Sequence, residues 1–228
     1  MKTTTKKLTV LAMLGALAYV VMFFGRIPVV LFLKYDPKDI VITIGGFLYG
    51  PLAALAVTVA VSFVEMFTAS TTGLIGLLMN IVSGAAFACT AALIYQKNRS
   101  LKGAVIGLVA AWLLTTAVMV MWNYLITPIF MFTPEMAERG MSVADLRQQV
   151  VKMLLPAFVP FNLLKGGLNA AITMLLYKPV KSALQAARMM PSSEEQGKPG
   201  KFNLGVIIAS VFVIATCVLW WLVLQGKL

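Results

Sequence analysis

The stretch Phe32-Leu-Lys-Tyr-Asp-Pro-Lys-Asp39 places four charges between long apolar runs, in a chain of which only 12% of the residues are charged. Short polar connections of this kind are typical of helices in a membrane, because irregular backbone has to leave the hydrocarbon. The stretch also carries two aromatic side chains, Phe32 and Tyr35. It is therefore expected either as a solvated turn or as a charged lid at the mouth of a helix bundle.

The composition around this stretch indicates a membrane protein. Hydrophobic residues make up 60% of the chain, and the mean hydropathy is +0.91. Soluble domains contain about 45–50% apolar residues, so this excess needs a bilayer to solvate it. Helices satisfy their own backbone groups in lipid, which predicts an all-α integral membrane protein. The chain has no histidine and no G-x-x-x-x-G-K-[S/T] loop, which excludes histidine-dependent catalysis and argues against a nucleotide-binding domain.

Seven apolar segments are expected to form membrane helices, at residues 8–24, 40–49, 52–67, 74–95, 105–130, 154–177 and 204–224. The second is short for a span, and Gly45-Gly46 and Gly50-Pro51 are expected to break it up. The first continues well past a possible signal-peptide cleavage site, so it is interpreted as a helix. Ser142-Val-Ala-Asp145 resembles a capping box and predicts a short surface helix within residues 133–152.

The segments divide the chain into three parts. Residues 1–181 are expected to form a six-helix core, residues 182–203 a flexible basic linker, and residues 204–228 an accessory seventh transmembrane helix. Lysine and arginine gather near the N-terminus, at residues 97–102 and at residues 178–201. Because basic loops stay in the cytoplasm, this bias predicts a cytoplasmic N-terminus, and the net charge of +11 is read as topology, not as a nucleic-acid site.

Polar side chains within the sixth apolar segment are candidates for a binding site. Asn162, Lys165 and Asn169 are spaced at i, i+3 and i+7, which places them on one helical face. Ionisable residues inside a membrane are costly and are functional candidates by default. Lys165 is expected to point into the bundle, towards a cavity open to the outside. The alternative is a packing role in which Lys165 pairs with Glu65.

Other segments add further candidates. Asn123 in the fifth segment and Asn80 in the fourth can each offer a donor and an acceptor to a planar heterocycle. Their alternative role is a hydrogen bond between helices, which is common in membranes. In the first segment, Ala12 and Ala16 form a small-x-x-x-small pair that allows close helix packing. The partner of that pair is either another helix of the same bundle or another protein.

Together these pieces resemble the substrate-binding S component of energy-coupling-factor (ECF) vitamin transporters, in particular the riboflavin-specific type. The resemblance covers roughly residues 7–181, and the seventh helix departs from the six-helix core of that family. It rests on Phe32–Asp39 followed by Ile44–Pro51, on Ser70–Gly73 with Asn80, on Asn123-Tyr124 with Thr127-Pro128, and on Pro160–Gly166.

The resemblance implies a bundle that binds riboflavin from the outside, with the first loop folded over the site. It implies the ligand-binding residues Lys34, Tyr35, Asp36, Thr43, Asn80, Asn123, Asn162 and Lys165. It also implies that Ala12 and Ala16 dock on a transmembrane coupling subunit, and that two separate ATPase subunits supply the energy. Riboflavin is then the transported ligand, and no catalytic residue, metal site or resident cofactor is expected.

Three alternatives remain open from the sequence. The first is an S component for another vitamin, such as thiamine, pantothenate or folate. The second is a small membrane enzyme that uses Glu65 and Lys165 as an acid–base pair. No recognisable constellation of nucleophile and base accompanies those two residues, which disfavours an enzyme. The third is a membrane assembly factor that transports nothing.

Overall fold

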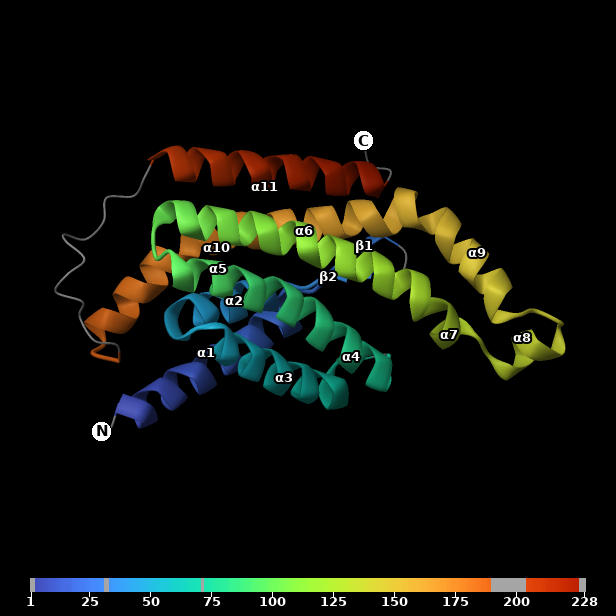
Figure 1. Cartoon of the computed structure of the whole chain (residues 1–228), viewed down its shortest axis with the longest axis horizontal. Coiled ribbons are helices and arrows are strands. Elements are labelled where there is room, and N and C mark those ends of the chain that lie inside the picture. The colour runs from blue at the N-terminus through green and yellow to red at the C-terminus, as the bar shows by residue number, and fades with distance from the viewer. Residues whose placement is uncertain (1–2, 31–32, 71, 190–203, 226–228) are drawn as a thin grey trace.

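Long helices dominate the computed structural model, which describes residues 3–30, 33–70, 72–189 and 204–225. Figure 1 shows α6, α10 and α11 along the long axis of the molecule, with α1 and α3 inclined to them. The bundle helices are α1 (Thr3–Gly25), α2 (Lys38–Tyr49), α3 (Pro51–Thr68), α4 (Gly73–Gly84), α5 (Thr90–Lys97), α6 (Leu101–Leu125), α10 (Val159–Ala186) and α11 (Leu204–Leu224).

Shorter elements join the bundle helices. Two π-helical turns, η1 (Ala85–Cys89) and η2 (Leu154–Phe158), connect α4 to α5 and α9 to α10 without a break in the helix. The other short elements are β1 (Ile27–Val30), β2 (Leu33–Tyr35), α7 (Thr127–Met131), α8 (Pro134–Glu138) and α9 (Val143–Met153). The strands form an antiparallel hairpin, which the all-α prediction did not include. The predicted capping box is confirmed, since Ser142 and Asp145 exchange hydrogen bonds at the start of α9.

Six of the described helical stretches are long and apolar enough to cross a membrane. They cover residues 5–25, 51–68, 73–97, 101–125, 143–186 and 204–223. The chain is thus a multi-pass membrane protein built on a helix bundle. The predicted second span is the exception, because α2 has 12 residues and a helix of that length rises only about 18 Å.

Protein, not lipid, surrounds the short helix α2. Every residue from Lys38 to Phe47 is buried. The prediction that Gly45-Gly46 interrupts this segment is wrong, because both glycines lie inside the continuous helix. A Cβ on Gly46 would lie 3.0 Å from the Cβ atoms of Ala54 and Ala92. The missing side chain therefore lets α2 pack closely against α3 and α5.

Hydrogen bonds near the two chain ends show which parts of the molecule the ends of α1 and α11 contact. Lys6 near the start of α1 donates a hydrogen bond to the carbonyl of Arg188, just beyond α10. The far end of α11 instead reaches Pro28 in the hairpin. The linker was predicted to begin at residue 182, but α10 continues to Ala186. Most of the predicted linker, residues 190–203, and the last residues, 226–228, lie outside the described residues.

Candidate functional site

A cavity of about 270 Å³ opens between the hairpin, the α3–α4 loop, α4, α6, α7 and α10. Its apolar wall includes Leu33, Ile75, Met79, Met119, Trp122 and Phe161. Its polar lining comprises Arg26, Lys34, Asp36, Glu65, Ser70, Thr72, Asn80, Ser83, Asn123, Thr127, Asn162 and Lys165. A mostly apolar concavity with a few placed polar groups is the usual form of a small-molecule site.

Two of the three amides that line this cavity come from α6 and α10. Asn123 of α6 donates from Nδ2 to the carbonyl of Met119 at 2.7 Å and accepts from the hydroxyl of Thr127 at 2.9 Å. Asn162 of α10 donates from Nδ2 to the carbonyl of Phe158 at 2.8 Å. An amide offers two N–H groups and a carbonyl oxygen. These local bonds therefore fix each side chain and leave further donor and acceptor capacity for a ligand.

Lys165 lies on the same face of α10 and forms an ion pair with α2. Its Nζ lies 3.0 Å from Oδ2 of Asp39 and 3.4 Å from the hydroxyl of Ser83. Asn169, one turn further along α10, donates from Nδ2 to the same Asp39 oxygen at 3.4 Å and accepts from the hydroxyl of Tyr35 at 3.1 Å. These contacts bind α10 to α2 and to the hairpin beside the cavity.

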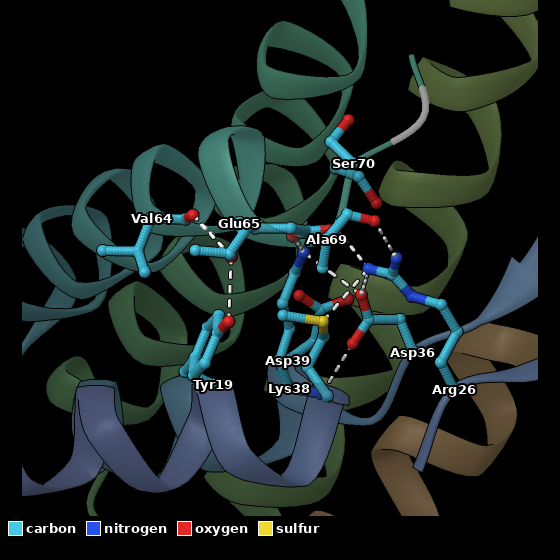
Figure 2. A network of polar contacts seen from close by, with 12 residues as sticks. Tyr19, Arg26, Asp36, Lys38, Asp39, Val64, Glu65, Ala69 and Ser70 are labelled. Carbon is cyan, nitrogen blue, oxygen red and sulfur yellow. Dashed lines mark hydrogen bonds and ion pairs between the residues drawn. The ribbon is translucent and has the colours of Figure 1, made fainter. Parts of the chain in front are cut away.

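A second network of charges joins the hairpin to α3 (Figure 2). Glu65 forms ion pairs with both Arg26 and Lys38. Asp36 lies 3.2 Å from each of these two cations. The carbonyl of Ala69, at the end of α3, accepts a hydrogen bond from Arg26 at 3.3 Å. The network therefore ties the base of the hairpin to the C-terminal end of α3.

Most charges of the loop are buried in these two sets of ion pairs. Asp36, Lys38 and Asp39 are 6%, 1% and 1% exposed. The interpretation of the stretch as a solvated turn is therefore wrong for these three residues, although Lys34 is exposed. Burial alone would raise the pKa of Asp36, but Lys38, Lys165 and Arg26 outweigh it and hold that pKa below its ordinary value.

The structure brings six of the eight predicted ligand-binding residues to the cavity: Lys34, Asp36, Asn80, Asn123, Asn162 and Lys165. Tyr35 and Thr43 are not among the lining residues. Tyr35 is buried and donates to Asn169, and burial raises the pKa of its hydroxyl. Thr43 is fully buried and donates to the carbonyl of Asp39 at 2.6 Å. Tyr35 and Thr43 therefore contact Asn169 and Asp39, which hydrogen-bond to each other, and do not line the cavity themselves.

The two remaining predicted contacts also have defined positions. Ala12 and Ala16 are exposed on α1 and do not pack inside the bundle. Glu65 and Lys165, the acid–base pair of the enzyme alternative, have other ion-pair partners, since Glu65 pairs with Arg26 and Lys38. Among the described residues, no cluster of histidine, cysteine, aspartate or glutamate could hold a metal ion.

Sequence reasoning missed several lining residues. Arg26 is the charged one, and the principle that ionisable groups near apolar segments are functional would have flagged it. Glu65 was considered only as a partner of Lys165 and not as a lining residue. Trp122 and Phe161 carried no signal, because aromatic residues also occur throughout the lipid-facing surface. Ser83 could not be distinguished from other small residues in its helix. Its role depends on Lys165, which comes from a distant part of the chain.

Comparison with known proteins places this cavity in a family context. A family model described as "ECF transporter, substrate-specific component" matches residues 6–177. A solved structure titled "Structure and mechanism of the S component of a bacterial ECF transporter" superposes with a TM-score of 0.60 at 27% sequence identity. The match covers 80% of this chain and 99% of the solved chain.

Three curated proteins are similar over most of their lengths. The riboflavin transporter RibU of Staphylococcus aureus (strain TCH60) is 27% identical, over 79% of this chain and 93% of that protein. The riboflavin transporter RibU of Streptococcus thermophilus (strain ATCC BAA-250 / LMG 18311) is 29% identical, over 80% and 86%. The riboflavin transporter FmnP of Bacillus subtilis (strain 168) is 28% identical, over 80% and 96%.

Proposed function

This chain belongs to the substrate-specific components of ECF transporters, and from that premise we propose that it captures riboflavin in the cavity between the hairpin, α4, α6 and α10. Its curated relatives are transporters, not enzymes. The observation that carries the proposal is the convergence of Asn123, Asn162 and Lys165 on one cavity. These residues come from two helices and line the same small space.

The lining suits a flat ring with a polar edge. The isoalloxazine ring of riboflavin is apolar on its faces and carries donors and acceptors along its edge. Met79, Met119, Trp122 and Phe161 offer apolar and aromatic surface for the faces. The amides of Asn80, Asn123 and Asn162 offer donors and acceptors for the edge. Buried polar groups that lose a partner are costly, so such an edge gives specificity.

The ion pairs beside the cavity favour an uncharged ligand, and Lys34 adds one exposed cation to the lining outside these pairs. Three cationic side chains form ion pairs beside the cavity, and three carboxylates are their partners. The cations are Arg26, Lys38 and Lys165, and the carboxylates are Asp36, Asp39 and Glu65. Because each cation already has an anionic partner, an additional anionic group gains little there. The ribityl chain of riboflavin is neutral and needs no such group.

Transport requires partners, which the proposal also names. Exposed Ala12 and Ala16 on α1 would dock on a transmembrane coupling subunit, because small side chains let two helices approach closely. Two ATPase subunits would supply the energy. The proposed orientation has the N-terminus in the cytoplasm and the hairpin outside, which follows from the distribution of basic residues.

A titration of the purified protein in detergent tests the proposal. Riboflavin should bind and lose fluorescence as Trp122 and the other lining groups surround its ring, while thiamine, pantothenate and folate should not compete. Binding of one of those vitamins in place of riboflavin would assign the chain to another vitamin. Absence of binding by all four would contradict the proposed function.

A further inference from the structure

Helix α11 lies outside the part of the chain that the family shares. The family model ends at residue 177, and 80% of this chain accounts for 99% of the solved S component. Yet α11 is seated on the bundle against α10 (Figure 1). Ser210 and Cys217, two turns apart, are buried in this helix, among the residues whose burial is described. A Cβ on Gly167 of α10 would lie 3.2 Å from Sγ of Cys217, so the glycine forms the seat for this helix.

The C-terminal end of α11 makes hydrogen bonds with the hairpin. Trp221 donates from Nε1 to the carbonyl of Pro28 at 3.3 Å. Gln225 donates from Nε2 to the same oxygen at 3.0 Å. In the hairpin, Pro28 pairs with Lys34, which lines the cavity. Two donors from α11 thus bind the carbonyl of Pro28. Pro28 lies directly opposite the cavity residue Lys34 in the hairpin.

Apolar contacts reinforce this connection. One buried cluster combines residues of the hairpin, of α9, η2 and α10, and of α11, and Trp221 packs against it. Its buried members are Val29, Leu33, Tyr35, Val150, Phe158, Phe161, Leu164 and Cys217. Leu33 and Phe161 belong to the cavity wall as well. The contacts of α11 therefore reach the groups that enclose the ligand site.

The hairpin has a physical need for such a partner. A two-stranded sheet leaves both outer edges without a neighbouring strand, so a carbonyl on an outer edge has no partner within the sheet. Pro28 has no backbone N–H, so no further strand can pair with it in the regular way. Side-chain donors from α11 satisfy its carbonyl without extending the sheet.

We propose that α11 restrains the hairpin, with Trp221 and Gln225 acting as positioning residues that hold Pro28 and thereby keep Lys34 and Asp36 at the cavity. The restraint sets how fast the ligand leaves. Its role for flavin rests on the proposed function, whereas the restraint itself exists in the ligand-free protein. This difference allows the two ideas to be tested separately.

The test uses the full-length protein with Trp221→Phe, Gln225→Ala and both changes together. Phenylalanine keeps an aromatic ring and removes the donor. Trp220→Phe is the matched control, because Trp220 donates no hydrogen bond to the hairpin among the described interactions. Hydrogen–deuterium exchange of the hairpin amides is measured without ligand, and flavin dissociation is followed by the return of its fluorescence.

The hairpin amides should exchange about fivefold faster for each lost hydrogen bond, with unchanged exchange in α6 and α10. Riboflavin should dissociate faster by a similar factor, and Trp220→Phe should match the wild type. Unchanged hairpin exchange in the double variant would overturn the restraint, whatever the ligand does. Faster hairpin exchange in a protein that binds no flavin would support the restraint and contradict the proposed function alone.

Discussion

The ammonium group of Lys165 lies 3.0 Å from a carboxylate oxygen of Asp39, which joins the N-terminal part of α10 to the first turn of α2. Asp39 is 1% exposed, and its other oxygen, Oδ1, has no hydrogen-bond partner among the described residues. Lys165 is thus both a lining residue of the cavity and the main counter-charge of a buried carboxylate. A change at Lys165 will affect folding and binding together.

Replacement of Lys165 by methionine should lower the free energy of unfolding by about 3–5 kcal/mol, because it leaves Asp39 buried without its cation. Asp39→Asn in the same background should restore part of that loss. The measurement is the thermal unfolding midpoint in detergent. Lys152→Met, at an exposed lysine of α9, is the control. Equal stability of Lys165→Met and the wild type would show that the ion pair contributes little.

The amides of the cavity should contribute directly to ligand affinity. Asn123→Ala and Asn162→Ala are each expected to weaken riboflavin binding by about 1–3 kcal/mol, because the polar edge of the ring loses a partner. Thr116→Val is the control on the same helix as Asn123, since its hydroxyl donates to the carbonyl of Trp112 and does not line the cavity. If fluorescence titration gives wild-type affinity for both alanine variants, the amides serve packing only.

The exposed alanines of α1 should matter for transport and not for binding. Ala12→Leu with Ala16→Leu is expected to leave riboflavin affinity unchanged and to abolish uptake into cells, because the larger side chains keep a partner helix away. Ala209→Leu with Ala215→Leu makes the same chemical change at exposed positions of α11. Loss of uptake in that control as well, or loss of binding in the α1 variant, would contradict the docking role.

The pairing of Asp36 predicts a defined pH dependence. Its pKa in the folded protein lies below the ordinary value of 3.8. A carboxyl group with a lowered pKa stabilises the fold above its unfolded pKa and loses this contribution as the pH falls through its folded pKa. The difference in unfolding midpoint between the wild type and Asp36→Asn should therefore be constant from about pH 7 to about pH 5.

Below pH 3.8 that difference should shrink, because the wild-type carboxyl becomes protonated. Glu138→Gln, at an exposed acid of α8, should show no comparable difference at any pH. A difference that already disappears well above pH 3.8 would mean that the three cations do not stabilise the charged form of Asp36.

Much of the candidate site was predictable because its signal is local. Asn162 and Lys165 share a helical face by their spacing alone, and an amide or ammonium in an apolar segment needs a reason to be there. The chain alone also indicated the membrane environment and the long helices, because apolar composition over about 20 residues is enough to predict a span. The capping box at Ser142 and Asp145 is equally local.

The pairings were decided only by the tertiary structure. From the sequence, Glu65 was one possible partner for Lys165. In the structure, Lys165 forms its ion pair with Asp39, and Glu65 pairs with Arg26 and Lys38. The sequence also did not predict that other helices surround α2 or that Trp221 contacts the hairpin. Apolar periodicity shows that a helix buries one face but not which neighbour covers it, and a charge in the sequence does not show which opposite charge it will meet. Those choices depend on how distant segments pack against one another.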